Sequence, residues 1–147
     1  MSRGLAVALG VGAGCLVGMQ APINARLGTV VGKVQAATFS FLVGTAVLLV
    51  VAAFVGGGLG TLGHVGRAPW WALVGGLLGA IYVTVALIAV NTLGASGLTA
   101  VVITGQLVTS VAIDRFGLLG IAKQHIGAPR VVGLVLLAVG VVLVVRK

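Results

Sequence analysis

Residues 34–55 read VQAATFSFLVGTAVLLVVAAFV, a stretch in which no side chain is charged. An α-helix rises 1.5 Å per residue, so about 20 apolar residues are needed to cross the hydrocarbon core of a bilayer. Apolar and polar residues do not alternate along the stretch, and a membrane β-strand would require such alternation. The stretch therefore predicts a transmembrane α-helix.

Four further apolar runs surround this one. Pro22 and Asn24 follow the first run, and a glycine-rich stretch over residues 56–66, which we expect to be a loop, follows the second. Trp70 and Trp71 open the third run, and a very short turn over residues 93–96 separates it from the fourth. The sequence therefore predicts an all-α integral membrane protein. Its single membrane domain, residues 1–147, has five transmembrane helices at about residues 4–22, 34–55, 70–91, 97–113 and 131–145.

The composition excludes a soluble monomer and argues against nucleic acid as a partner. Only 7% of the residues are charged and 60% are hydrophobic, whereas about 25% charged residues are usual in soluble domains. The net charge of +8 would suggest nucleic-acid binding in a soluble chain. Here Lys and Arg stand at the ends of apolar runs, where their long side chains reach lipid phosphates. We therefore expect the lipid bilayer as partner, in the bacterial cytoplasmic (inner) membrane.

The distribution of cations gives little preference for either orientation in the membrane. With five spans the termini lie on opposite sides, and a Lys/Arg excess on one side would set the orientation. Five cations fall on the N-terminal face and four on the other. They are Arg3, Arg67, Arg115, Lys123 and Arg130 on the first face, and Arg26, Lys33, Arg146 and Lys147 on the second. We predict dual topology with an antiparallel homodimer; the alternative is one orientation, weakly favoured with the N-terminal face in the cytoplasm.

Small residues indicate where helices approach closely. Lipid is as apolar as Leu, so transmembrane helices associate through close backbone contact and interhelical hydrogen bonds. Gly10, Gly14 and Gly18 form one stripe on the first predicted helix, and Gly75 and Gly79 have the same spacing on the third. These glycines predict helix packing and carry no chemistry of their own.

Polar side chains inside the spans point to a substrate pathway. Such groups are costly in hydrocarbon unless they face a bundle interior or a water-filled cavity. Three of the predicted helices each carry a polar strip, and converging strips would line a shared cavity. The predicted lining residues are Gln20, Asn24, Tyr82, Asn91, Gln106 and Ser110. The alternative is that the amides of Gln20 and Gln106 only join neighbouring helices.

Charged and reactive side chains are few. Asp114 is the only acidic residue and either pairs with Arg115 as an anchor at a helix end or acts as a gate or coupling charge. Arg26 is open to the same two interpretations. His64 and His125 lack ligands at metal-binding spacing, so we expect no metal and no cofactor. Acid–base catalysis needs paired titratable groups, so we do not expect an enzyme.

Four stretches together resemble the drug/metabolite transporter (DMT) superfamily, and specifically its short five-helix YdcZ-like members. They are GMQAPINARLG at residues 18–28, FSFLVG at 39–44, WALVGGLLGAIY at 71–82 and GQLVTSVAIDRFG at 105–117. The resemblance implies half of a ten-helix bundle whose two halves are inverted repeats. It also implies that a second copy, or a paralogous five-helix partner, supplies the other half.

One feature departs from better-known relatives in this superfamily. The small multidrug-resistance branch exchanges protons for cations at a glutamate in its first helix, but this chain contains no Glu and has Gln20 at the corresponding position. An amide does not titrate, so this exchange mechanism does not carry over, and Asp114 is the only carboxyl side chain available. We expect neutral or anionic solutes rather than strongly cationic drugs.

The sequence thus predicts a transporter of small solutes that works by alternating access, with an antiparallel homodimer as its working unit. The sequence leaves two alternatives open. One is a membrane scaffold or accessory subunit, and the other is a passive channel or facilitator.

Overall fold

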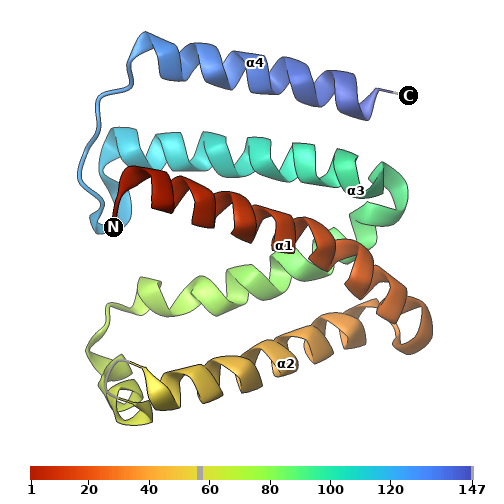
Figure 1. Cartoon of the computed structure of the whole chain (residues 1–147), viewed down its shortest axis with the longest axis vertical. Helices are drawn as coiled ribbons and strands as arrows, with labels where there is room; N and C mark the ends of the chain where they lie inside the picture. Colours follow the sequence, from red (N-terminus) through yellow and green to blue (C-terminus); the bar gives the residue numbers. More distant parts are fainter. Residues whose placement is uncertain (56–57, 147) are drawn as a thin grey trace. The chain divides into compact units, whose positions relative to one another are not determined.

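The computed structural model describes residues 1–55 and 58–146, and these residues form helices without a strand (Figure 1). This confirms the predicted all-α class. By residue contacts the chain divides into unit 1, Met1–Asn91, and unit 2, Thr92–Lys147. The single domain expected from the sequence stays a prediction. In chain order the elements are α1 (Arg3–Val31), α2 (Lys33–Phe54), η1 (Leu59–Arg67), η2 (Trp70–Val74), α3 (Gly75–Phe116), η3 (Leu118–Gly120) and α4 (Ala128–Val145), where η marks a 3₁₀-helix.

The described helices account for the five predicted spans. Four stretches are long and apolar enough to cross a membrane: Arg3–Val31, Lys33–Phe54, Trp70–Phe116 and Ala128–Val145. The third has 47 residues, more than twice the length of a single crossing. Gly94 interrupts it with φ 71° and ψ 169°, a conformation that glycine adopts without steric cost. This break falls in the predicted turn over residues 93–96, so the stretch supplies both the third and the fourth span.

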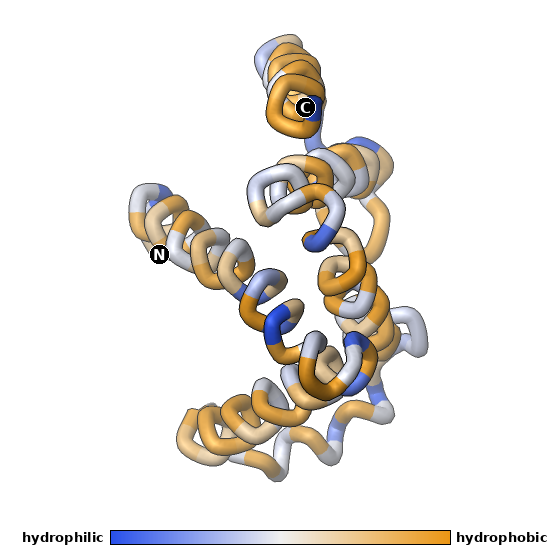
Figure 2. Tube along the Cα trace, turned by 90° about the vertical axis from the view of Figure 1, so that its right-hand side faces the viewer, coloured by the Kyte–Doolittle hydropathy of each residue, from blue (hydrophilic) through white to orange (hydrophobic). Residues whose placement is uncertain are grey.

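Hydropathy is distributed as expected for membrane-spanning helices. Hydrophobic residues extend along the helices, and hydrophilic residues concentrate near their ends and connections (Figure 2). Many large apolar side chains are accordingly exposed, as on α4, where Leu136 and Leu143 are 66% and 68% exposed. Such surface would be unstable in water, but it matches lipid tails.

Two predicted boundaries were wrong. The first span was expected to end near residue 22 with a polar exit, but α1 continues to Val31 with Pro22 inside it. A proline removes one backbone donor, and a long transmembrane helix tolerates that loss. The helix ends instead at Gly32, whose φ is 95° and whose N–H donates to the Gly28 carbonyl at 3.1 Å.

The second wrong boundary concerns the glycine-rich stretch over residues 56–66. We expected it to be a loop throughout, but Leu59–Arg67 forms the 3₁₀-helix η1. Gly56 and Gly57 lie outside the described residues. Every third residue from 60 to 66 is a glycine, a spacing that matches the three-residue turn of a 3₁₀-helix.

Unit 1 is held by a small core where three helices meet. Ala36 and Ala37 from α2 are buried against Val83 and Leu87 from the first half of α3. Leu87 is completely buried, and a Cβ atom added to Gly28 of α1 would lie 3.5 Å from its Cδ2. The small alanines and the glycine therefore let the three backbones come close, as in other membrane bundles.

Unit 2 pairs the second half of α3 with α4. Near one end, a Cβ atom added to Gly97 would lie 3.9 Å from Val145 Cγ2. Near the other end, Asp114 binds Arg130. Since residues near the start of one helix meet residues near the end of the other, the two helices run antiparallel. The connection between them turns at Gly117, which has φ 67°.

Candidate functional site

The clearest candidate site in unit 1 is a small pocket with three polar lining residues between α1 and α2, which we call the α1–α2 pocket. Its volume is about 190 Å³. One water occupies about 30 Å³ of liquid, so the pocket can hold a small solute group together with water. The lining residues are Gln20, Ser40, Phe41, Gly44, Thr45 and Leu48.

Asn24 lies beside this pocket and bonds one of its lining residues. The side chain is buried, with 6% of the residue exposed, and Nδ2 donates to Ser40 Oγ at 3.1 Å. A hydroxyl that accepts a hydrogen bond can still donate its own hydrogen elsewhere. The bond from Asn24 therefore leaves the Ser40 hydroxyl able to donate to a molecule in the pocket.

Gln20 lies one helical turn before Asn24, so the two side chains share a face of α1. Gln20 is half-buried, and no hydrogen bond joins its side chain to another residue in the described part of the chain. Its amide offers two N–H donors and one carbonyl acceptor. The pocket thus presents an amide and two hydroxyls, with no charged group among its lining residues.

A second pocket of about 420 Å³ adjoins the first one. It lies between α2 and the first half of α3 and shares Phe41 and Thr45 with the α1–α2 pocket. Thr38 and Thr84 also line it, but their hydroxyls donate to carbonyls of their own helices at 3.0 and 2.8 Å. This pocket is therefore mostly apolar, and Gln20 and Ser40 line only the α1–α2 pocket.

The remaining lining residues predicted in unit 1 have different surroundings. Tyr82 is half-buried and packs against the core of unit 1. Asn91 is exposed, and its Nδ2 donates to the Leu87 carbonyl of its own helix at 3.4 Å. Of the four predicted residues in this unit, only Gln20 lines the α1–α2 pocket. Asn24 contributes through its hydrogen bond to the lining residue Ser40.

Sequence reasoning missed Ser40 and Thr45 as lining residues. Ser40 and Gly44 are small residues at four-residue spacing, a pattern that indicates helix packing rather than a pocket. The polar character of Ser40, read together with Asn24 on the preceding helix, could have suggested the pair. The contact between Asn24 and Ser40 depends on how the chain turns at Gly32 between α1 and α2. A sequence pattern does not show the direction of that turn.

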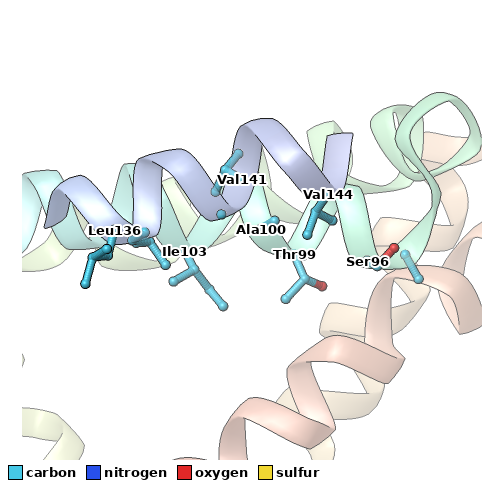
Figure 3. A pocket seen from close by; sticks show the side chains of 10 residues that line it. Ser96, Thr99, Ala100, Ile103, Leu136, Val141 and Val144 are labelled. Atoms are coloured by element: carbon cyan, nitrogen blue, oxygen red, sulfur yellow. The ribbon is translucent and has the colours of Figure 1, made fainter. Parts of the chain in front are cut away.

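Unit 2 contains a larger and more apolar pocket, of about 610 Å³, between α3 and α4. Figure 3 shows the hydroxyls of Ser96 and Thr99 toward one end, and Ile103 and Leu136 toward the other. Gln106 and Ser110 are exposed and are not among its lining residues. That these two residues meet the strip of unit 1 in one cavity stays a prediction.

Asp114 forms an ion pair, but not with the expected residue. Its Oδ2 lies 2.5 Å from Nη2 of Arg130, at the start of α4, whereas Arg115 is exposed. Successive residues on a helix point in different directions, so neighbours such as Asp114 and Arg115 do not face each other. The Asp114 carbonyl also accepts from the Gln124 N–H at 2.8 Å. The Asp114–Arg130 ion pair and this hydrogen bond therefore hold the connection between α3 and α4 in place.

The predicted roles of Arg26 and Asp114 as gate or coupling charges stay predictions. Arg26 is exposed near the end of α1, and its carbonyl accepts from the Thr29 hydroxyl at 2.7 Å. Among residues 1–55 and 58–146, no group of three His, Cys, Asp or Glu side chains is placed to hold a metal ion.

Of the predicted packing glycines, Gly79 makes a close contact within its own unit. A Cβ atom at Gly79 would lie 3.3 Å from Cζ of Phe41, so this glycine lets α3 approach α2. Within unit 1, and apart from the adjoining residues and backbone of the same helix, no atom lies within 4 Å of the corresponding position at Gly10, Gly14, Gly18 or Gly75. The packing role of these four stays a prediction.

Comparison with known proteins agrees with this architecture. The profile of the family described as "Putative inner membrane exporter, YdcZ" matches residues 5–143. The chain is 28% identical to "Inner membrane protein YdcZ" of Escherichia coli (strain K12) over 148 residues, covering 100% of this chain and 99% of that protein. No solved structure gives a significant match. The chain therefore belongs to the YdcZ family of the drug/metabolite transporter superfamily and is a multi-pass inner membrane protein.

Proposed function

We propose that the chain transports small, uncharged, hydrogen-bonding solutes by alternating access, as an antiparallel homodimer. Family membership supports membrane transport at a coarse level. The observation that carries the finer proposal is the α1–α2 pocket, in which Gln20 and Ser40 offer hydrogen bonds between two membrane-spanning helices. Polar groups at such a position are costly unless they bind water, protein or a ligand.

The chemistry of the pocket favours neutral solutes. Gln20 both donates and accepts, and Ser40 and Thr45 contribute hydroxyls. A cation would lose its hydration without gaining a carboxylate, and desolvating an unpaired charge is expensive. A neutral molecule with carbonyl, amide or hydroxyl groups can replace its water by these side chains at little cost.

The number of spans and the charge distribution support the proposed dimer. Transporters of this architecture combine two halves of opposite orientation around one site near the middle of the membrane. Five spans make one such half, and five cations on one face against four on the other allow both orientations. A paralogous five-helix chain would serve as the second half equally well.

Proteoliposomes that contain the purified chain test the proposed solute class. We expect faster uptake of a small neutral amide or polyol than of a matched quaternary ammonium compound, because no carboxylate lines the pocket. Flux is measured with radiolabelled solutes, with protein-free liposomes as control. Preferential binding and transport of the quaternary ammonium compound would contradict the proposed class.

Cysteine labelling tests dual topology. Single cysteines are placed near residues 3 or 146 in a Cys15→Ser background with both arginines kept, and intact cells are treated with a membrane-impermeant maleimide. Copies inserted in both orientations are expected to give partial labelling at both positions, each rising to completion after permeabilisation. Labelling of only one position in intact cells would show a fixed orientation and exclude an antiparallel homodimer.

A further inference from the structure

The segment between the second and third spans has a strict three-residue pattern. Residues 59–67 read LGTLGHVGR, so each triplet consists of an apolar residue, a glycine and a polar residue. The apolar positions are Leu59, Leu62 and Val65, and the polar positions are Thr61, His64 and Arg67. A period of three is neither the 3.6 of an α-helix nor the 2 of a strand.

In the structure, this pattern places the three classes of residue in three separate columns along a helix. Leu59–Arg67 forms η1, a 3₁₀-helix of 9 residues, and a 3₁₀-helix has three residues per turn. Each class of residue therefore lies in its own column along the helix. Side chains three apart eclipse one another, which normally limits such helices to about four residues. Here one column consists of glycines and has no side chains to crowd.

The apolar column is exposed along its whole length. Leu59, Leu62 and Val65 are 46%, 52% and 48% exposed. In the polar column, Thr61 donates its hydroxyl to the Gly58 carbonyl at 3.0 Å. No hydrogen bond or ion pair joins the side chains of His64 and Arg67 to other residues within 1–55 or 58–146.

The position of η1 between two spans indicates what these columns contact. α2 ends just before η1, and the stretch Trp70–Phe116 begins just after it, so η1 lies where the chain emerges from the membrane. Trp70 and Trp71 are 78% and 40% exposed, and tryptophan rings prefer the level of the lipid headgroups. A helix with an apolar face and a cationic face lies flat in this zone.

We propose that η1 is an interfacial anchor that binds anionic lipid headgroups. The apolar column of Leu59, Leu62 and Val65 enters the outer acyl region, while Arg67 and His64 face lipid phosphates. The occupant is the lipid surface, because an exposed apolar column and the guanidinium of Arg67, which has no partner in the described part of the chain, occur together on a segment between two spans. This inference does not depend on transport or on the dimer.

A cysteine scan tests the orientation of η1. Single cysteines at residues 59, 61, 62, 64, 65 and 67, in full-length Cys15→Ser protein, are reconstituted in phosphatidylglycerol-containing vesicles. Cysteines at 59, 62 and 65 are expected to react about tenfold more slowly with a water-soluble maleimide, because apolar surroundings disfavour the reactive thiolate. Their fluorescent adducts should also be quenched by brominated lipid.

The period of three is the decisive result of this scan. Equal reactivity at all six positions would overturn the proposal. Slow reaction at 59, 62 and 65 without quenching by brominated lipid would also overturn it, since protein rather than lipid would then cover the column.

Energy transfer tests the preference for anionic headgroups. The two tryptophans of the chain, Trp70 and Trp71, lie next to η1, so their transfer to dansyl-labelled lipid reports the lipids around it. We expect more transfer to dansyl-phosphatidylglycerol than to dansyl-phosphatidylcholine. The Arg67→Gln change should reduce the enrichment of phosphatidylglycerol around the tryptophans about fivefold, the value of one cation near an anionic surface.

The Arg146→Gln variant is the matched control, because it removes one cation from the end of another span. It is expected to leave the transfer from the tryptophans unchanged. Equal transfer to the two labelled lipids in the wild-type protein would overturn the proposal. An unchanged ratio of transfer in the Arg67→Gln variant would also overturn it, since Arg67 would then not recruit the lipid.

Discussion

Replacing Gln20 by Leu is expected to lower solute flux about fivefold, because a bound solute loses a hydrogen bond worth about 1 kcal/mol. Leu has a similar size, so the α1–α2 pocket should keep its shape. Gln20 has no hydrogen-bond partner in the described part of the chain, and its loss should therefore cost little stability. Flux is measured in proteoliposomes with a neutral solute, and helical content by circular dichroism.

Gln35→Leu is the matched control for this prediction. Gln35 is an exposed glutamine near the start of α2 that is not among the residues lining the α1–α2 pocket. It receives the same chemical change and is expected to keep wild-type flux. Equal flux in the Gln20→Leu variant and the wild type would contradict the role of the pocket in transport.

Gln106→Leu separates a transporter from a scaffold. If Gln106 lines the pathway, its loss lowers flux while the dimer persists, as judged by cross-linking in the membrane. In a scaffold, the amide would serve helix association, and the variant would lose assembly. Loss of assembly in both the Gln20→Leu and Gln106→Leu variants would favour the scaffold.

Replacing Leu87 by Ala is expected to lower the free energy of unfolding by about 2 kcal/mol. Leu87 is completely buried where Gly28 of α1 and Ala36 and Ala37 of α2 meet α3. When the helices separate in a bilayer, the Leu87 side chain contacts lipid rather than water. The hydrophobic contribution to the free energy of unfolding is therefore small. What remains is the packing lost around the cavity, which sets the expected size of the effect.

Leu77→Ala provides the control for the stability measurement. Leu77 lies on the same helix and is 61% exposed, so the same truncation should cost less than about 0.5 kcal/mol. Both variants are unfolded reversibly in mixed micelles with increasing dodecyl sulfate, followed by circular dichroism. Equal destabilisation of the two variants would contradict the core described for unit 1.

The membrane-spanning class and most span positions could be predicted because they depend on composition and length alone. Residues 34–55 must cross a bilayer for the same reason wherever the other helices lie. The end of α1 could not be predicted, because Pro22 usually signals a boundary, whereas α1 continues through it to Val31. The 3₁₀-helix at residues 59–67 was missed because we interpreted its glycines as a loop rather than counting their period.

The candidate site was only partly predictable. Gln20 is conspicuous because an amide in an apolar run needs a reason to be there. Its neighbours Ser40 and Thr45 are small residues that occur in many membrane helices, so they gave no comparable signal. Asn24 could be recognised as a residue of interest, but its bond to Ser40 could not be anticipated from spacing on one helix.

By itself, the sequence determined that the chain is a bundle of membrane-spanning helices with few polar groups, because hydrophobicity and length act locally along the chain. Only the tertiary structure decided which polar groups interact. Asn24 forms a hydrogen bond with Ser40, and Asp114 forms an ion pair with Arg130 rather than Arg115. Each of these pairs joins residues 16 positions apart on different helices. Such contacts depend on the turns at Gly32 and Gly117, and a hydropathy pattern contains no information about the direction in which a turn sends the next helix.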